Sequence, residues 1–201
     1  MSDALRYGPL GAHCIHLCVD MQRMFAEETD WYMPWMKRVC PVVERVVAHA
    51  PDRTIFTRFI PAAHPGEGQG TWRHYYRRWA SMTLEHVGED MVELMPALRR
   101  FVPPAVVVDK HVYSPWIKTD LQSRLARRET DTLIITGGET DICVLATVLG
   151  AIDRGYRVVI ALDALCSSSD SAHDASMRVY LTRFGQQVET ATADEILGAW
   201  G

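Results

Sequence analysis

Three side chains suited to hydrolytic chemistry each follow a strand-like run of the sequence. Asp20 follows "CIHLCV", Lys110 follows "AVVVD", and Cys143 comes a few residues after "TLIITG". In an open α/β sheet, ligands bind beyond the carboxyl ends of the strands. If these strands are neighbours, a carboxylate, an ammonium and a thiol meet in one cleft. The alternative is that Asp20 and Lys110 are unrelated surface charges at separate strand ends.

Cys143 lies where a helix is expected to begin, with Thr140 or Asp141 placed to cap it. An apolar stripe at helical spacing follows: Leu145, Val148, Leu149 and Ile152. The free N–H groups and dipole of a first helical turn favour an anion, so we expect a lowered thiol pKa. The same N–H groups can hold an oxyanion formed when the sulfur attacks a carbonyl. The competing interpretation is that Cys143 is a small buried helix residue without a catalytic role.

A carboxylate and an ammonium at the ends of buried strands are costly unless they are paired. If the pair lies near Cys143, Asp20 can take the thiol proton and later pass it to a leaving amine. Lys110 would then hold the carboxylate in place and balance its charge. These three types of side chain together therefore favour acyl transfer.

Strand-like runs alternate with helical patterns along the chain. We expect strands at 14–19, 53–59, 105–109, 132–137, 157–162 and 186–190. Their near-continuous apolar character is typical of strands buried on both faces, as in a parallel sheet. The alternation predicts an α/β fold: a three-layer α/β/α sandwich with a six-stranded, mostly parallel sheet, in a single domain over residues 1–201. A helix within 31–50 is expected to begin or kink near Pro41.

Residues 61–88 interrupt this alternation between the second and third strands. A Pro/Gly-rich loop leads into a stretch rich in aromatic residues: Trp72, Tyr75, Tyr76 and Trp79. One interpretation is a surface excursion with solvated arginines. The other is a lid insertion over the site, in which Arg73 or Arg77 would meet a carboxylate on the substrate.

Composition and charge argue against several classes of function. The 201 residues carry a net charge of −4 without a basic stripe, which gives no reason to expect nucleic acid. No apolar run reaches the roughly 18 residues of a membrane span, and the first residues lack a signal-peptide pattern. The five cysteines include no Cys-x-x-Cys pair, which favours a reduced protein. We therefore expect a cytoplasmic protein with neither nucleic-acid nor membrane partners.

The segments around the three chemical residues resemble the isochorismatase-like cysteine hydrolases, a superfamily that includes nicotinamidase and N-carbamoylsarcosine amidohydrolase. The likeness covers most of the chain and rests on "VDMQRMF", "VDKHVYSPW" and "GGETDICVLATVLGAIDRGYRVVIALDAL". It implies the Rossmann-like fold of that family. It also implies that Asp20 is the general base, Lys110 its partner and Cys143 the nucleophile that forms a thioester acyl-enzyme.

Further features follow from the resemblance alone. It implies a non-proline cis peptide at Gly138–Glu139 and an oxyanion hole made by the backbone N–H groups of Glu139 and Cys143. Phe25 and Trp116 match positions where relatives place pocket aromatics, although either could equally be a core residue. Because relatives often pair subunits beside the active site, a homodimer or homotetramer is expected.

The resemblance also bears on the reaction. Members that cleave the vinyl ether of isochorismate generally lack a nucleophilic cysteine, so Cys143 favours cleavage of a non-peptide C–N bond, amide or ureido, in a small molecule. Nicotinamidases bind a metal through an Asp and two His, whereas His64 and His74 here have no aspartate near them. No metal and no other cofactor is therefore expected. A vinyl-ether hydrolase and a non-catalytic binding module on the same fold are the alternatives.

Overall fold

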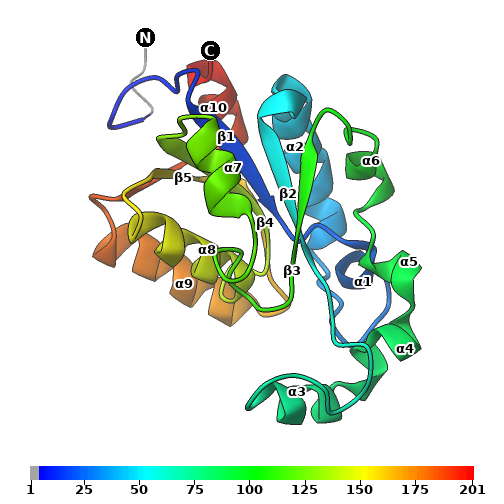
Figure 1. Cartoon of the computed structure of the whole chain (residues 1–201). Coiled ribbons are helices and arrows are strands. Elements are labelled where there is room, and N and C mark those ends of the chain that lie inside the picture. The colour runs from blue at the N-terminus through cyan, green and yellow to red at the C-terminus, as the bar shows by residue number, and fades with distance from the viewer. Residues whose placement is uncertain (1–4) are drawn as a thin grey trace.

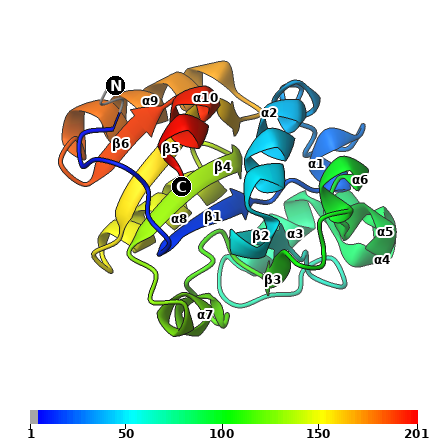
Figure 2. The ribbon, with the colours of Figure 1, turned by 90° about the horizontal axis from the view of Figure 1, so that it is seen from above.

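The computed structural model describes residues 5–201 and contains one central sheet with helices on both faces (Figure 1). Its strands are β1 (Cys14–Val19), β2 (Thr54–Phe59), β3 (Val106–Lys110), β4 (Thr132–Gly138), β5 (Arg157–Cys166) and β6 (Val188–Ala191). They pair in the order β3-β2-β1-β4-β5-β6, which Figure 2 shows from above. Every pair is parallel, so the predicted α/β sandwich is confirmed.

Five helices of the described residues cover the two faces of the sheet. The first face is covered by α2 (Met36–His49) and α10 (Ala193–Ala199), and the second by α7 (Leu121–Arg127), α8 (Cys143–Ile152) and α9 (Asp170–Arg183). The remaining α-helices are α1 (Arg23–Ala26), α3 (Trp72–Arg78), α4 (Leu84–Val87), α5 (Glu89–Val92) and α6 (Pro96–Arg99). Within residues 5–201, no helix combines the length and the apolar character needed to cross a membrane.

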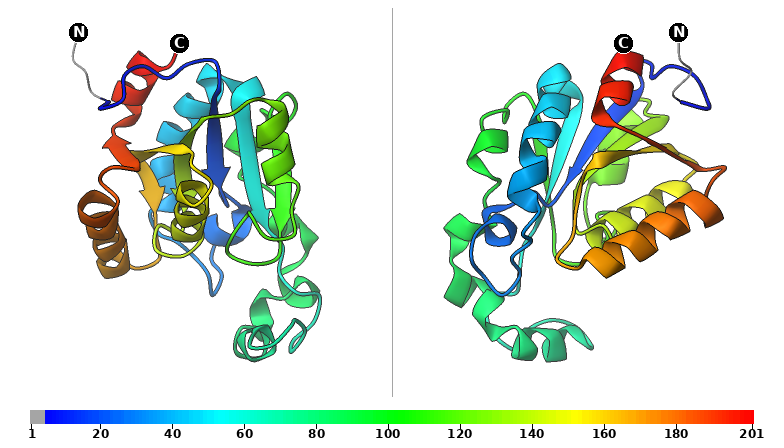
Figure 3. Two further views of the ribbon diagram at one scale, coloured as in Figure 1. Left: turned by 60° about the vertical axis from the view of Figure 1, so that its left-hand side comes forward. Right: turned by 180° about the vertical axis from the view of Figure 1, so that it is seen from behind.

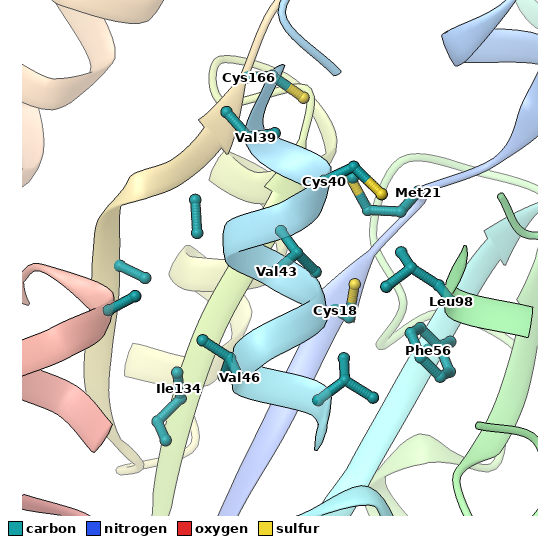
Figure 4. Packing of buried hydrophobic residues seen from close by; sticks show 14 of the residues in the cluster. Cys18, Met21, Val39, Cys40, Val43, Val46, Phe56, Leu98, Ile134 and Cys166 are labelled. Carbon is teal, nitrogen blue, oxygen red and sulfur yellow. The ribbon is translucent and has the colours of Figure 1, made fainter. Parts of the chain in front are cut away.

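The alternating side chains of β1 fill both halves of the core. Cys14 and Cys18 belong to the cluster under α2 and α10, whereas Ile15 and Leu17 belong to the cluster under α8. Figure 4 shows the valine stripe of α2 packed over Cys18 and its neighbours. Burial on both faces explains why this strand is apolar along its whole length.

The start of α2 contradicts one of two expectations, that the helix begins near Pro41. The helix begins at Met36 and contains Pro41, rather than beginning near the proline. A proline inside a helix removes one backbone hydrogen bond. Here Val39, Val43 and Val46 are buried on one side of the helix, and burial of this stripe outweighs the lost hydrogen bond.

The strand order places the chemical residues along one edge of the sheet. The chain winds outward from β1 to β3 in one direction and from β4 to β6 in the other, so the order reverses between β1 and β4. Such a switch point opens a crevice beyond the carboxyl ends of the strands. Figures 1 and 3 show the α3 segment beyond this same edge, set off from the sheet.

Candidate active site

Asp20, Lys110 and Cys143 meet in the interior at this switch point. Lys110 Nζ lies 2.7 Å from Asp20 Oδ2 and 3.5 Å from Cys143 Sγ. It also donates a hydrogen bond to the carbonyl oxygen of Val112 at 3.2 Å. All three side chains are buried, Cys143 being 7% exposed. The ammonium thus contacts both the carboxylate and the sulfur.

The electrostatics of this cluster differ from the expectation for the thiol. Burial raises the pKa of the Cys143 thiol, although the Lys110 ammonium opposes this effect; the negative charge of Asp20 adds to the rise. The predicted lowering of the thiol pKa is therefore wrong, because loss of solvation outweighs the position at a helix start. Burial also disfavours the Lys110 ammonium, but the neighbouring Asp20 and Cys143 outweigh it and raise the lysine pKa. Both shifts favour a charged lysine and a protonated thiol in the resting cluster.

Asp20 is held by the neighbouring strand β2. Thr57 Oγ1 donates a hydrogen bond to Asp20 Oδ1 at 2.5 Å, and the Asp20 N–H donates to the Thr57 carbonyl oxygen at 3.2 Å. Apart from the Lys110 ion pair, Asp20 Oδ2 has no partner among residues 5–201. Lys110 is therefore the charged partner of this oxygen, and Thr57 the hydroxyl partner of the other. Sequence patterns missed Thr57, whose signal is a hydroxyl within the apolar run "TIFTRF".

The turn between β4 and α8 carries the backbone groups expected for an oxyanion hole. The Gly138–Glu139 peptide bond is cis. The Glu139 carbonyl oxygen accepts hydrogen bonds from the N–H groups of Ile142 and Val144 at 3.1 and 2.9 Å, which closes the turn. Neither the Glu139 nor the Cys143 N–H donates to any acceptor in the described chain. Both donors are thus available to a ligand.

The expected side-chain cap of α8 is absent from this described turn. The capping position is Ile142, whose side chain cannot accept a hydrogen bond. Thr140 Oγ1 instead donates to the Cys166 carbonyl oxygen at 3.0 Å, and Asp141 accepts from the Ser167 hydroxyl at 2.5 Å. Both side chains therefore fasten this turn to the end of β5.

Cys143 lies in the wall of a cavity of about 230 Å³. Six aromatic residues line it: Phe25, Trp31, Phe59, Tyr75, Trp79 and Tyr113. The other lining residues are Asp30, Met33, Gly138, Glu139, Ile142 and Ser168. The thiol therefore faces a mainly aromatic space large enough for a small organic molecule.

Segment 61–88 contributes one wall of this cavity, but not through its arginines. Tyr75 on α3 and Trp79, the residue that caps the end of this helix, line the space. Arg73 and Arg77 are exposed and absent from the lining, and Arg73 Nε donates to the Gly68 carbonyl oxygen at 3.0 Å. The prediction that Arg73 or Arg77 meets a substrate carboxylate disagrees with this arrangement, because the helix turns them away from the aromatic pair.

The two expected pocket aromatics have different positions. Phe25 lines the cavity and stacks on Trp31 at a centroid distance of 6.1 Å. Trp116 lies outside the lining: its Nε1 donates to the Thr147 carbonyl oxygen at 2.9 Å, and its ring stacks on Tyr156 at 5.8 Å. Trp116 is thus a packing residue against α8, which was the other interpretation of its sequence position.

The histidines weighed as metal ligands lie apart from the cavity. His64 pairs with Glu85 at 2.7 Å on the surface, and His74 is exposed. Within residues 5–201, no three His, Cys, Asp or Glu side chains are grouped to hold a metal ion. His64 and His74 therefore do not come together as a set of ligands.

Comparisons with known proteins agree on one family. The isochorismatase domain model matches residues 14–192. An uncharacterised isochorismatase family protein of Bacillus subtilis is 31% identical over 104 residues, covering 50% of this chain and 57% of the relative. Ureidoacrylate amidohydrolase of Methylobacterium radiotolerans is 32% identical over 97 residues, covering 48% of this chain and 38% of the relative.

The chain spans about half the length of the curated relatives that it matches. The similarity to a solved structure covers more of the chain. A cysteine hydrolase from Pseudomonas syringae pv. phaseolicola superposes with a TM-score of 0.82 at 25% identity, covering 99% of this chain and 98% of that one.

Proposed function

The chain belongs to the isochorismatase domain family, and we propose that it is a cysteine hydrolase cleaving a non-peptide C–N bond of a small molecule. Similar proteins named as a cysteine hydrolase and an amidohydrolase support this reaction class. The observation that carries the proposal is the contact of Lys110 with both Asp20 and Cys143, at 2.7 and 3.5 Å, in the wall of an aromatic cavity.

The proposed first half-reaction forms a thioester. Because burial keeps the thiol protonated, Asp20 takes its proton as the sulfur attacks the carbonyl carbon of an amide or ureido group. Lys110 stabilises the developing thiolate, and the free N–H groups of Glu139 and Cys143 bind the oxyanion. Asp20 then gives its proton to the leaving nitrogen, the C–N bond breaks, and the acyl group remains on the sulfur.

The second half-reaction returns the enzyme to its starting state. A water molecule loses a proton to Asp20 and attacks the thioester carbonyl. The carbon–sulfur bond breaks, the acid product leaves, and the sulfur regains its proton from Asp20. One carboxylate therefore serves as base and acid in turn, which requires the fixed position described above.

Ammonia or amine release from a panel of small amides, ureas, lactams and hydrazides tests this function. We expect Cys143→Ala and Asp20→Asn each to lower kcat roughly 10³-fold or more while circular dichroism shows a folded protein. Cys40→Ala changes another buried cysteine, outside the cavity lining, and is expected to retain wild-type turnover.

An active Cys143→Ala variant would contradict the proposal. Activity that depends on Asp20 but survives loss of Cys143 would indicate an acid-catalysed ether hydrolase instead.

A further inference from the structure

The aromatic residues of the cavity form a continuous wall around one ring. The centroid of Trp31 lies 5.8–6.4 Å from those of four others: Phe25, Phe59, Tyr75 and Trp79. Tyr113 extends the wall, 6.5 Å from Phe59 and 6.4 Å from Tyr75. Aromatic rings carry negative charge density on their faces and attract cations placed against them.

The charged residues of the lining are both acidic. Asp30 and Glu139 line the cavity, whereas no Arg, Lys or His of residues 5–201 does. Asp30 accepts a hydrogen bond from the Ser81 hydroxyl, and Glu139 accepts one from the Ser168 N–H at 3.2 Å. Neither carboxylate forms an ion pair within the described chain. Burial raises the pKa of Glu139, in keeping with this lack of a cationic partner.

The nearby basic groups do not compensate for these carboxylates. Lys110 is buried, and its charge is engaged by Asp20 at 2.7 Å and by the Cys143 sulfur. Arg73, Arg77 and Arg78 lie outside the lining. A carboxylate on a substrate would thus lose water against aromatic rings without gaining a counter-ion, which is unfavourable.

Two rings of the wall already face a cation: the Arg78 guanidinium lies 5.0 Å from the ring centroid of Trp79, and Lys110 Nζ lies 5.0 Å from that of Phe59. A cation in the place of that carboxylate gains the acidic side chains and the ring faces of Trp31, Tyr75 and Tyr113, over which no cation of the described residues lies.

We propose that the cavity selects small amide or ureido compounds whose non-reacting end is a cation, such as a trimethylammonium group, and discriminates against compounds that carry a carboxylate there. The proposal rests on the proposed function for the bond that is cleaved. Recognition of the non-reacting end can be measured as binding, without turnover. The proposed selectivity and the proposed function can therefore be tested separately.

Binding to the Cys143→Ala variant tests the selection directly. Indole fluorescence reports on the cavity because Trp31 and Trp79 line it. The ligands share an acetamide frame: betaine amide carries trimethylammonium, tert-butylacetamide is its uncharged isostere, and malonamate carries a carboxylate. We expect betaine amide to bind about tenfold more tightly than the isostere, and malonamate to bind most weakly.

Two substitutions on this background locate the source of the preference. Asp30→Asn is expected to reduce the ratio of the two affinities, betaine amide to tert-butylacetamide, by about threefold, the size typical of an exposed charge pair. Trp31→Leu should also reduce it, because one ring face is lost. Glu28→Gln removes a neighbouring exposed carboxylate outside this lining and should leave the ratio unchanged.

Equal affinity for betaine amide and tert-butylacetamide would overturn the selection, as would tighter binding of malonamate or no saturable binding of betaine amide. Selective binding by the Cys143→Ala variant, with no hydrolysis of any amide by the wild type, would support the selection and overturn the proposed function instead.

Discussion

The two oxygens of the Asp20 carboxylate have separate partners. Thr57 donates to Oδ1 at 2.5 Å, and Lys110 pairs with Oδ2 at 2.7 Å. Charge-assisted contacts of this kind fix the plane of a carboxylate as well as its place. We therefore regard Thr57 as a positioning residue, which acts on the reaction only through Asp20.

Thr57→Val keeps the side-chain shape but removes the hydroxyl that orients Asp20. We expect kcat/KM to fall about 10-fold to 100-fold, because a base displaced from its position transfers the proton less efficiently. Thr57→Ser restores the hydroxyl and should recover most of the activity. Steady-state kinetics on both variants checks this, and equal activity of Thr57→Val and the wild type would contradict the positioning role.

The residues of the site differ in how well the sequence predicts them. Asp20, Lys110 and Cys143 could be singled out because each follows a strand, and strand ends meet at one edge of a parallel sheet. Trp31 and Tyr113 could not, because they lie in loops without a periodic pattern. The orientation of Arg73 and Arg77 was also inaccessible, since a short helix can present either face to a cavity.

At the scale of elements, α8 is fastened to the loop after β3 through Trp116. The indole ring covers Gly150, where an added Cβ would lie 2.1 Å from Trp116 Cδ1. The indole N–H also donates to the Thr147 carbonyl oxygen at 2.9 Å. This contact joins the helix that begins at Cys143 to the chain segment that follows Lys110.

Gly150→Ala is expected to separate these two elements. The new methyl group overlaps Trp116, so we expect the free energy of unfolding to fall by about 1–3 kcal/mol. Gly198→Ala makes the same change on α10, where nothing lies within 4 Å of the added Cβ. It should raise stability by up to about 1 kcal/mol, because alanine favours helix. Urea unfolding of both variants measures this; equal effects would show that Trp116 does not restrict this position.

The end of a strand can depend on tertiary contacts that local sequence patterns do not predict. β5 continues to Cys166, beyond the expected end at 162, because Leu165 and Cys166 pair with the glycines that end β4. Asp163 within this extension is accommodated, since its carboxylate accepts a hydrogen bond from the Ala193 N–H at 2.8 Å. Local propensity disfavours aspartate in a strand, so only the tertiary contacts explain the longer element.

At the scale of the whole molecule, His16 connects the three central strands. Its ring nitrogens contact Thr54 Oγ1 of β2 at 3.3 Å and Thr136 Oγ1 of β4 at 2.8 Å. The side chain is fully buried, and burial lowers the pKa of His16 to about 3. The folded protein therefore keeps this imidazole neutral at a pH where the unfolded chain would protonate it.

Global stability should consequently decrease on acidification. Below the ordinary histidine pKa of about 6.5, the unfolded state binds a proton that the folded state rejects until about pH 3. This linkage lowers the free energy of unfolding by about 2 kcal/mol between pH 7 and pH 5. The His16→Gln variant keeps polar contacts but does not titrate, so its free energy of unfolding should fall by about 2 kcal/mol less than that of the wild type over the same pH range. Urea titrations at pH 7 and pH 5 measure this. An equal fall in the variant and the wild type would contradict the role of His16.

The overall architecture was the most predictable feature. Apolar strands alternating with helices lead to a parallel sheet with two covered faces, because few other arrangements bury such strands. The order of the strands, with its reversal between β1 and β4, depends on contacts between distant segments. A homodimer or homotetramer and a cytoplasmic location stay predictions.

In the proposed reaction, Cys143 becomes acylated by the substrate. Acid quenching during turnover of a hydrolysed amide, followed by peptide mass mapping, measures this directly. We expect an added mass equal to the acyl part of the substrate on the peptide that contains Cys143, and none on the peptide that contains Cys166. Hydrolysis that proceeds while Cys143 stays unmodified at every quench time would contradict it.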